Sequence, residues 1–192
     1  PCCLVGSEMC IRDRLNTILV ASAFFLFFVS FKDLLNKGFK NYSQSMAHFG
    51  FSLFILSILF NNFLSTEIIT NLKVGETFKS EKFKISFESI DQISKKNFQA
   101  VIGKFIIENQ NGVVDILNPE LRIYNQPNIV TSEADIKTNL FTDKFMTMNV
   151  VQNQEYFNIR YQVKPFMIWI WFSVLLISFG GLLSFVRKKY ES

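Results

Sequence analysis

Three long apolar runs constrain the fold of this chain more than any other feature of its sequence. The runs are Leu15–Phe31, Met46–Leu64 and Phe166–Val186. A helix needs about 20 predominantly apolar residues to cross the hydrocarbon core of a bilayer, and each run is close to that length. Such clustered apolar stretches are not typical of a soluble domain. The sequence therefore predicts a membrane protein with three transmembrane helices.

The charged residues predict which side of the membrane each part occupies. The formal net charge is +4, yet acidic and basic residues are equal in number between Thr66 and Pro165. The excess positive charge adjoins the apolar runs, at Lys32, Lys37, Lys40, Arg187, Lys188 and Lys189. With three spans, the 32–45 loop and the C-terminal tail share one side, which the positive-inside rule assigns to the cytoplasm. Nucleic acid is not expected as a partner, because the basic residues lie beside membrane segments.

Between the second and third apolar runs, the hydrophobic pattern changes to a period of two. Apolar residues alternate with polar ones over 82–88 and over 157–164, which is typical of half-buried strands. Two further runs, 101–107 and 113–117, flank an Asn111-Gly112 pair that favours a hairpin turn. Weaker strands are expected at 121–124 and 145–151, and no helix is expected here. The predicted fold class is thus an α+β membrane protein with three transmembrane helices. An extracytoplasmic all-β domain, a small sandwich or barrel, is expected between the second and third helices.

The expected boundaries follow from these patterns. Transmembrane helices are predicted at 15–31, at 46–64 with His48 inside it, and at 166–186. They are separated by a cytoplasmic loop at 32–45 and the β domain at 65–165, and a cytoplasmic basic tail occupies 187–192.

The first fourteen residues, PCCLVGSEMCIRDR, are set aside as a translated sequencing-adapter artefact or a disordered segment. They contain all three cysteines, Cys2, Cys3 and Cys10, without a second cysteine pair or a nearby histidine to complete a metal site. Without this segment the chain has no cysteine, so no thiol–disulfide chemistry is expected of the remainder.

His48 is the only histidine and lies near the start of the second apolar run. Ionisable residues inside a membrane segment are costly, and they generally face a partner, a cavity or a cofactor. Helical spacing places Gln44 and Ser52 on the same face as His48. One interpretation is a neutral histidine that hydrogen-bonds to Gln44, to Ser52 or to a neighbouring helix. The other is a ligand or proton-handling group, and imidazole is a standard axial ligand of haem iron.

Other candidate residues carry weaker signals. Trp169 and Trp171 are typical of an aromatic belt at the membrane interface, although they could also stack on a porphyrin. Gly180 and Gly181 favour close helix packing. A Ser/His/Asp set is impossible in the 65–165 region, because the only histidine lies in a membrane segment. No catalytic residue is therefore predicted.

Several motifs together resemble the C-terminal part of the bacterial cytochrome c maturation protein F (CcmF) family. The similarity covers about Asn16–Lys189, with agreement in order, spacing and expected topology. The segments that carry it are Met46–Gly50, Leu117–Tyr124, Thr131–Ile136, Tyr161–Phe166, Trp169–Trp171 and Gly180–Leu183.

The resemblance implies a role in cytochrome c-type biogenesis. Members of this family are membrane subunits of the haem lyase that attaches haem to apocytochrome c, in the bacterial inner membrane and with the β domain in the periplasm. The family binds a b-type haem through two histidines on different helices, and the motif match implies that His48 is one axial ligand of the haem iron. Implied partners are the haem chaperone CcmE, the presenting subunits CcmH and CcmI, apocytochrome c and the lipid bilayer.

This chain also departs from the family pattern. The family's other transmembrane histidine, its two extracytoplasmic histidines and its Trp-rich segment are absent. The resemblance thus implies a C-terminal fragment that is not active alone, and it leaves open whether the chain counts as an enzyme. A competing hypothesis is a non-catalytic membrane accessory protein whose extracytoplasmic β domain docks a partner and which binds no haem.

Overall fold

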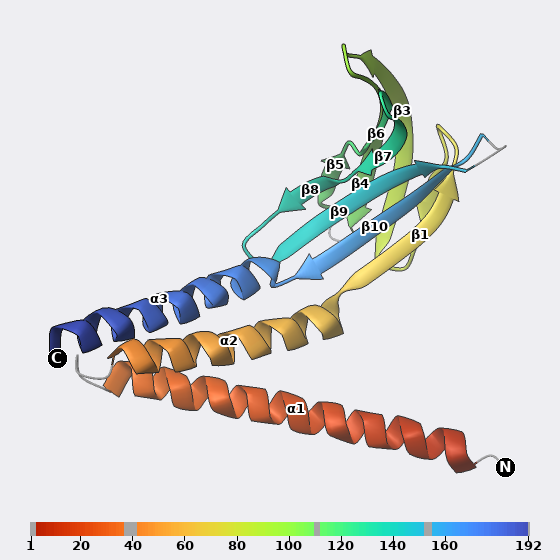
Figure 1. Cartoon of the computed structure of the whole chain (residues 1–192). Coiled ribbons are helices and arrows are strands. Elements are labelled where there is room, and N and C mark those ends of the chain that lie inside the picture. The colour runs from red at the N-terminus through yellow and green to blue at the C-terminus, as the bar shows by residue number, and fades with distance from the viewer. Residues whose placement is uncertain (1–2, 37–41, 110–111, 152–154, 192) are drawn as a thin grey trace. The chain divides into compact units, whose positions relative to one another are not determined.

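The structure, a computed structural model, describes residues 3–36, 42–109, 112–151 and 155–191. The chain forms two compact units (Figure 1). One comprises Pro1–Leu64 and Pro165–Ser192 and holds the helices α1 (Cys3–Asn36), α2 (Tyr42–Leu64) and α3 (Met167–Glu191). The other, Ser65–Lys164, is built of strands. Lys37, Lys40 and Asn111 lie outside the described residues, as do the side chains of 3–16 and 187–191.

Within the described ranges, three helices are long and apolar enough to cross a membrane: Thr17–Asn36, Tyr42–Leu64 and Met167–Val186. The prediction of three transmembrane helices with an all-β domain between the second and third is confirmed. The helices extend past the apolar runs, since backbone hydrogen bonds continue through polar residues. In particular, residues 3–14, which were expected to be an artefact or a disordered segment, are helical and form the beginning of α1.

The helix α2 packs against both α1 and α3. Its contacts with α1 are aromatic: the Phe49 ring lies 5.5 Å from that of Phe27 and 5.8 Å from that of Phe31. A hydrogen bond joins the C-terminal end of α2 to the residues just before α3. There the Asn61 amide donates to the Pro165 carbonyl at 2.7 Å.

The β domain contains two sheets. One has the order β1 (Thr66–Leu72), β10 (Phe157–Pro165), β9 (Thr142–Val150), β8 (Asp135–Thr138). The other has the order β2 (Thr77–Lys79), β3 (Phe83–Ser94), β4 (Phe98–Asn109), β6 (Glu120–Asn125), β7 (Asn128–Glu133), and β5 (Val114–Leu117) also pairs with β4. The apolar core is formed by Leu72, Ile85, Phe87, Phe105, Ile107, Leu117, Leu121, Met146, Met148, Ile159 and Tyr161. The alternation of apolar and polar residues thus correctly predicted that Ile85 and Phe87 of β3 and Ile159 and Tyr161 of β10 face the core.

The strands β4 and β5 on either side of the expected Asn111-Gly112 turn pair antiparallel, although Asn111 itself lies outside the described residues. Gly112 has a φ of 71°, a backbone conformation that glycine adopts without steric cost. The Asn109 carbonyl accepts a hydrogen bond from the Gly112 amide at 2.9 Å. The hydrophobic pattern did not predict β1, β2, β7 and β8, which are short or mostly exposed strands whose apolar residues do not alternate cleanly.

Polar contacts join the two sheets across their edges. Asp115 of β5 accepts hydrogen bonds from Lys144 of β9 and, at 2.6 Å, from Lys137 of β8. In addition, the Ser132 hydroxyl of β7 donates to the Met148 carbonyl of β9 at 2.7 Å. These bonds fix how one sheet lies over the other, which apolar packing alone specifies less strictly.

Candidate functional site

His48 lies in the second turn of α2, and the residues beside it are packed against neighbouring helices. A Cβ at Gly180 of α3 would lie only 2.9 Å from the Ala47 backbone nitrogen, so the two helix backbones nearly touch there. Gly50 is equally close to α3, because its Cβ would lie 3.0 Å from Ile177. Phe49 meets the aromatic rings of α1. The turn that carries His48 is therefore held from two sides.

The His48 side chain itself is exposed. Its Nε2 atom lies 3.5 Å from the Gln44 amide nitrogen, at the outer limit of hydrogen-bond distance. Ser52, expected on the same polar face, is instead buried and donates to the Phe49 carbonyl at 2.8 Å. Hydrogen bonds from His48 to Gln44 or Ser52 were the two expected within α2, and the structure contains only the weak contact with Gln44.

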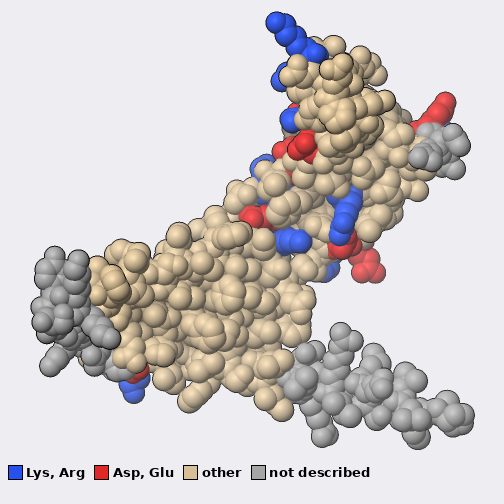
Figure 2. Space-filling model, in the orientation of Figure 1, with Lys and Arg blue, Asp and Glu red and all other residues tan. Residues whose placement is uncertain are grey.

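The face of α2 around His48 is apolar apart from its two ends. Phe51 and Ile58 are exposed on it, with Gln44 before them and Asn62 after them. Figure 2 shows the charged side chains gathered over the β domain, whereas the visible helix surface is nearly free of them except at one end. In a bilayer, an imidazole on such a face would contact hydrocarbon unless another group covered it.

The structure does not bring Trp169 and Trp171 together with His48. Both tryptophans lie in the first turns of α3, while Ser43 and Ala47, in the part of α2 that carries His48, contact Gly180, about 15 Å further along α3 at 1.5 Å per residue. Trp171 is 66% exposed, and the Trp169 ring meets Phe172 edge-on at 6.0 Å. This arrangement suits interface anchors better than a porphyrin stack against His48.

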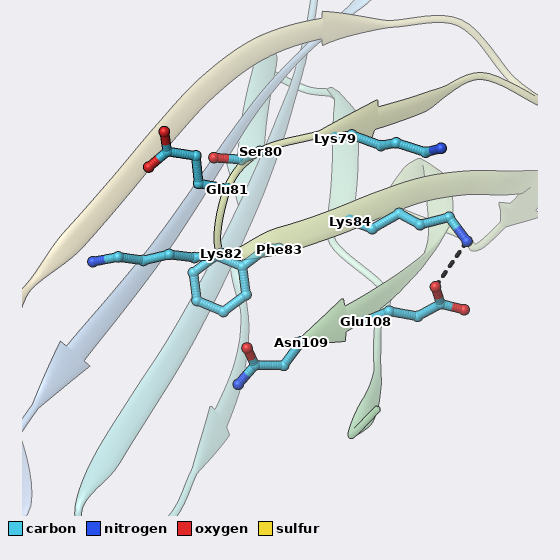
Figure 3. A pocket seen from close by; sticks show the side chains of 8 residues that line it. All are labelled: Lys79, Ser80, Glu81, Lys82, Phe83, Lys84, Glu108 and Asn109. Carbon is cyan, nitrogen blue, oxygen red and sulfur yellow. Dashed lines mark hydrogen bonds and ion pairs between the residues drawn. The ribbon is translucent and has the colours of Figure 1, made fainter. Parts of the chain in front are cut away.

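The β domain has hollows of about 390 and 320 Å³ lined by residues of its strands, and a smaller one near a turn. The smaller one, of about 200 Å³, lies at the β2–β3 turn, where Lys84 forms an ion pair of 2.7 Å with Glu108 (Figure 3). Figure 3 shows Lys79 and Lys84 pointing to one side of the turn and Glu81 and Lys82 to the other. Since these groups diverge, they do not form a site for chemistry.

Over the part of the chain that the structure describes, no group of three or more His, Cys, Asp or Glu side chains could hold a metal ion. Among the described residues, His48 therefore remains the candidate for a functional site. The helix contacts of Phe49 and Gly50 were not predicted from the sequence, although both residues lie beside His48 in the Met46–Gly50 segment. The small Gly50 and the aromatic Phe49 are residue types that favour contacts with neighbouring helices, and this pattern could have predicted their roles.

Comparisons with known proteins agree with this architecture. The sequence family described as "CcmF C-terminal beta-sandwich" matches residues 63–165. The chain is 29% identical to the cytochrome c-type biogenesis protein ccl1 of Rhodobacter capsulatus, over 79% of this chain and 23% of that protein. It is 27% identical to the cytochrome c-type biogenesis protein CcmF of Pseudomonas fluorescens, over 78% of this chain and 23% of that protein.

A solved structure described as cytochrome c heme lyase CcmF has the same fold. Its TM-score is 0.58 at 20% sequence identity, and the match covers 88% of this chain and 28% of that one. A membrane protein with three apolar helices and a β-sandwich between the last two is thus the class that the fold defines. The chain belongs to the CcmF family, as the match over its β domain shows. It spans about a quarter of the length of the relatives it matches.

Proposed function

We propose that this chain acts in cytochrome c biogenesis, as part of the membrane subunit of a haem lyase that attaches haem to apocytochrome c. Family membership supports this role. The observation that carries the proposal is an exposed imidazole on a helix face that is otherwise apolar. Such a group is costly next to lipid and becomes favourable when it binds a metal centre.

His48 would supply one axial ligand to a b-type haem in the membrane. Its side chain fits this role, because its ring is exposed and its contact with Gln44 is long enough to leave Nε2 available. The neighbouring exposed Phe51 and Ile58 would offer apolar surface to a porphyrin. When bound, the haem would supply one-electron redox chemistry, in line with reduction of incoming haem iron. The packed turn of α2 would hold the imidazole in a constant direction.

The second axial ligand must come from elsewhere if it is also a histidine, since this chain has only one. No residue of this chain is proposed to be catalytic. The exposed face of α2 would contact other helices of the same lyase. CcmE, CcmH with CcmI, and apocytochrome c are the proposed partners. The proposed location is the bacterial inner membrane, with the β domain in the periplasm.

Replacement of the proposed ligand tests this function. In the intact gene product purified from membranes, we expect a Soret band of a six-coordinate b-type haem. The variant His48→Ala should lose most of that band, because one axial bond to iron is removed. The measurement is the haem-to-protein ratio together with the visible absorption spectrum.

The matched control is Gln44→Ala, which alters the same face of α2 one turn away. It should keep the haem, since a weak contact at 3.5 Å contributes little. Full haem content and an unchanged spectrum in His48→Ala would contradict the ligand assignment. A protein without haem would favour the alternative of an accessory subunit whose β domain docks a partner.

A further inference from the structure

We propose that the end of the β3–β4 hairpin, with the strands β6 and β7 beside it, is a docking surface for an acidic, extended segment of a partner protein. The residues of this tip surface are Ile93, Lys95, Phe98, Arg122, Tyr124 and Ile129. All of them belong to the unit Ser65–Lys164. The proposal goes beyond the haem role of His48 and does not depend on it.

Strand register places the apolar members of the tip surface on one face of the sheet. Phe98 of β4 pairs with Tyr124 of β6, and Tyr124 pairs in turn with Ile129 of β7. Residues directly opposite each other in antiparallel strands point to the same face. Ile93 of β3 pairs with Ala100, which follows Phe98 by two residues, so Ile93 also lies on this face. Because Ile93 and Ile129 are 42% and 48% exposed, apolar surface is open to a partner.

Two cations lie over the aromatic centre of this surface. The Phe98 ring lies 5.4 Å from that of Tyr124. The Arg122 guanidinium carbon is 5.1 Å, and the Lys95 ammonium 5.5 Å, from the centre of the Phe98 ring. Both distances are within the range at which the face of a ring attracts a cation. Tyrosine and arginine are also enriched among the residues that contribute most to binding at protein interfaces.

The charges at the tip favour an acidic partner. Lys95 and Lys96 lie in the turn between β3 and β4, and Figure 2 shows basic side chains at this end of the β domain. Within the part of the chain that the structure describes, neither lysine forms an ion pair. Arg122 is paired with Glu120 at 2.9 Å, so the unbalanced positive charge belongs to the two lysines.

The same face becomes acidic further from the tip than Arg122. Asp91 of β3 and Glu120 of β6 both lie opposite Ile102 of β4, and Glu133 of β7 lies opposite Glu120. These carboxylates therefore form one row across the sheet. The row repels an acidic segment, whereas the lysines of the turn attract it. The charge pattern thus limits the docking surface to the tip.

An edge strand beside the tip surface favours a polypeptide over other anions. β7 is the last strand of its sheet, and its residues Asn128, Ile129 and Val130 are exposed. The outer edge of such a strand can pair with an added strand through backbone hydrogen bonds. Only a polypeptide supplies that pairing, and its alternate side chains would lie beside Ile129 on this face. Two lysines are also few compared with the roughly 6–10 phosphate contacts of a typical DNA-binding protein.

Peptide binding tests the proposal. The intact gene product in detergent is titrated at low salt with a short fluorescent peptide in which glutamate alternates with valine or phenylalanine. The test variant is Lys95→Gln with Lys96→Gln, and the matched control is Lys79→Gln with Lys82→Gln at the opposite end of β3. All four lysines are exposed, so both double variants remove the same charge without disturbing the core. Fluorescence anisotropy gives the Kd.

We expect saturable binding that the test variant weakens about 3- to 10-fold, the effect of removing two exposed ion pairs. The control should bind the peptide as the wild type does. Absence of saturable binding, or an equal loss in both double variants, would overturn the proposal. Equal affinity for the same peptide with glutamine in place of glutamate would also overturn it, because the lysines would then not recognise charge.

Two further measurements separate a peptide site from a general anion site. Ile129→Ser should weaken peptide binding about threefold, because it removes apolar contact beside the edge strand. An unchanged Kd in this variant would refute docking at this edge. Displacement of the peptide by an equal concentration of glycerophosphoglycerol, a soluble lipid headgroup, or of a single-stranded oligonucleotide would overturn the proposal in favour of a lipid or a nucleic acid.

Discussion

At the scale of single residues, Asp115 shows how one charge can organise the β domain. Its side chain is 7% exposed, and it accepts hydrogen bonds from Lys137 and Lys144 of the opposite sheet. Burial raises the pKa of this carboxyl, but the two lysines outweigh burial and the pKa is lowered overall. Asp115 also opposes ionisation of Tyr161, whose pKa is raised first by burial and then by this nearby charge.

A lowered pKa makes the stability of the β domain depend on pH in a defined direction. The contribution of Asp115 is complete above its unfolded pKa of 3.8 and is lost as the pH falls through the lower folded value. Asp115→Asn should destabilise the domain by about 2–3 kcal/mol near neutral pH, because Lys144, whose side chain is only 14% exposed, loses its charge partner. The variant should also lose less stability than the wild type on acidification.

The measurement is thermal unfolding of the protein in detergent, followed by β-sheet circular dichroism near neutral pH and in acid. Asp91→Asn, at an exposed position of β3, is the control and should change little. If both variants melt at the wild-type temperature, the cross-sheet role of Asp115 is refuted.

At the scale of secondary-structure elements, close contact between α2 and α3 sets the position of the His48 turn. A Cβ at Gly180 would approach the Ser43 carbonyl oxygen and the Ala47 nitrogen to 2.9 Å each. These are backbone atoms of a helix, which cannot move aside as a flexible side chain would. Gly181, the next residue, has open space around its Cβ position. The two adjacent glycines thus have different roles.

This difference predicts opposite outcomes for neighbouring substitutions. Gly180→Leu should force α2 and α3 apart and cost about 1–3 kcal/mol, the usual range for overpacking. Gly181→Leu should leave the melting temperature in detergent unchanged or slightly raised, since glycine is a poor helix former. The test compares melting temperatures of the two variants. Equal losses in both would show that Gly180 is not a close-contact position.

The junction between β10 and α3 has an unusual backbone conformation that contacts with α2 stabilise. Phe166 has a φ of 60°, which is unfavourable for a residue with a bulky side chain. Its ring lies 5.2 Å from that of Phe60, and Asn61 binds the carbonyl of the preceding Pro165. Contacts made by the end of α2 therefore stabilise the conformation from which α3 begins.

At the scale of the whole molecule, the charge distribution predicts the orientation in the membrane. A periplasm-dependent reporter enzyme fused after Asn111 should be active, and one fused after Ser192 should be inactive. The reason is that six basic residues flank the spans on one side, while the β domain is electrically balanced. Reporter activity in intact cells is the measurement. Activity only at the C-terminal fusion would reverse the proposed orientation.

The sequence by itself determined the class of this protein. Apolar runs of membrane-spanning length predict helices because backbone groups in hydrocarbon must be paired within the segment. Alternation over β3 and β10 predicts inward residues such as Ile85 and Tyr161, since side chains of a strand point to alternate faces. The Met46–Gly50 and Tyr161–Phe166 segments indicated the CcmF family before any contact was known.

Only the tertiary structure decided which neighbours these residues have. Periodicity placed Ser52 on the face of His48, but packing buried it and left Gln44 as the weak contact. The cross-sheet partners of Asp115 and the unequal surroundings of Gly180 and Gly181 arise from segments distant in the chain. The sequence alone cannot distinguish Gly180 from Gly181, because both are glycines at adjacent positions of one helix. Local pattern specifies an element and its faces, whereas long-range packing specifies what each face meets.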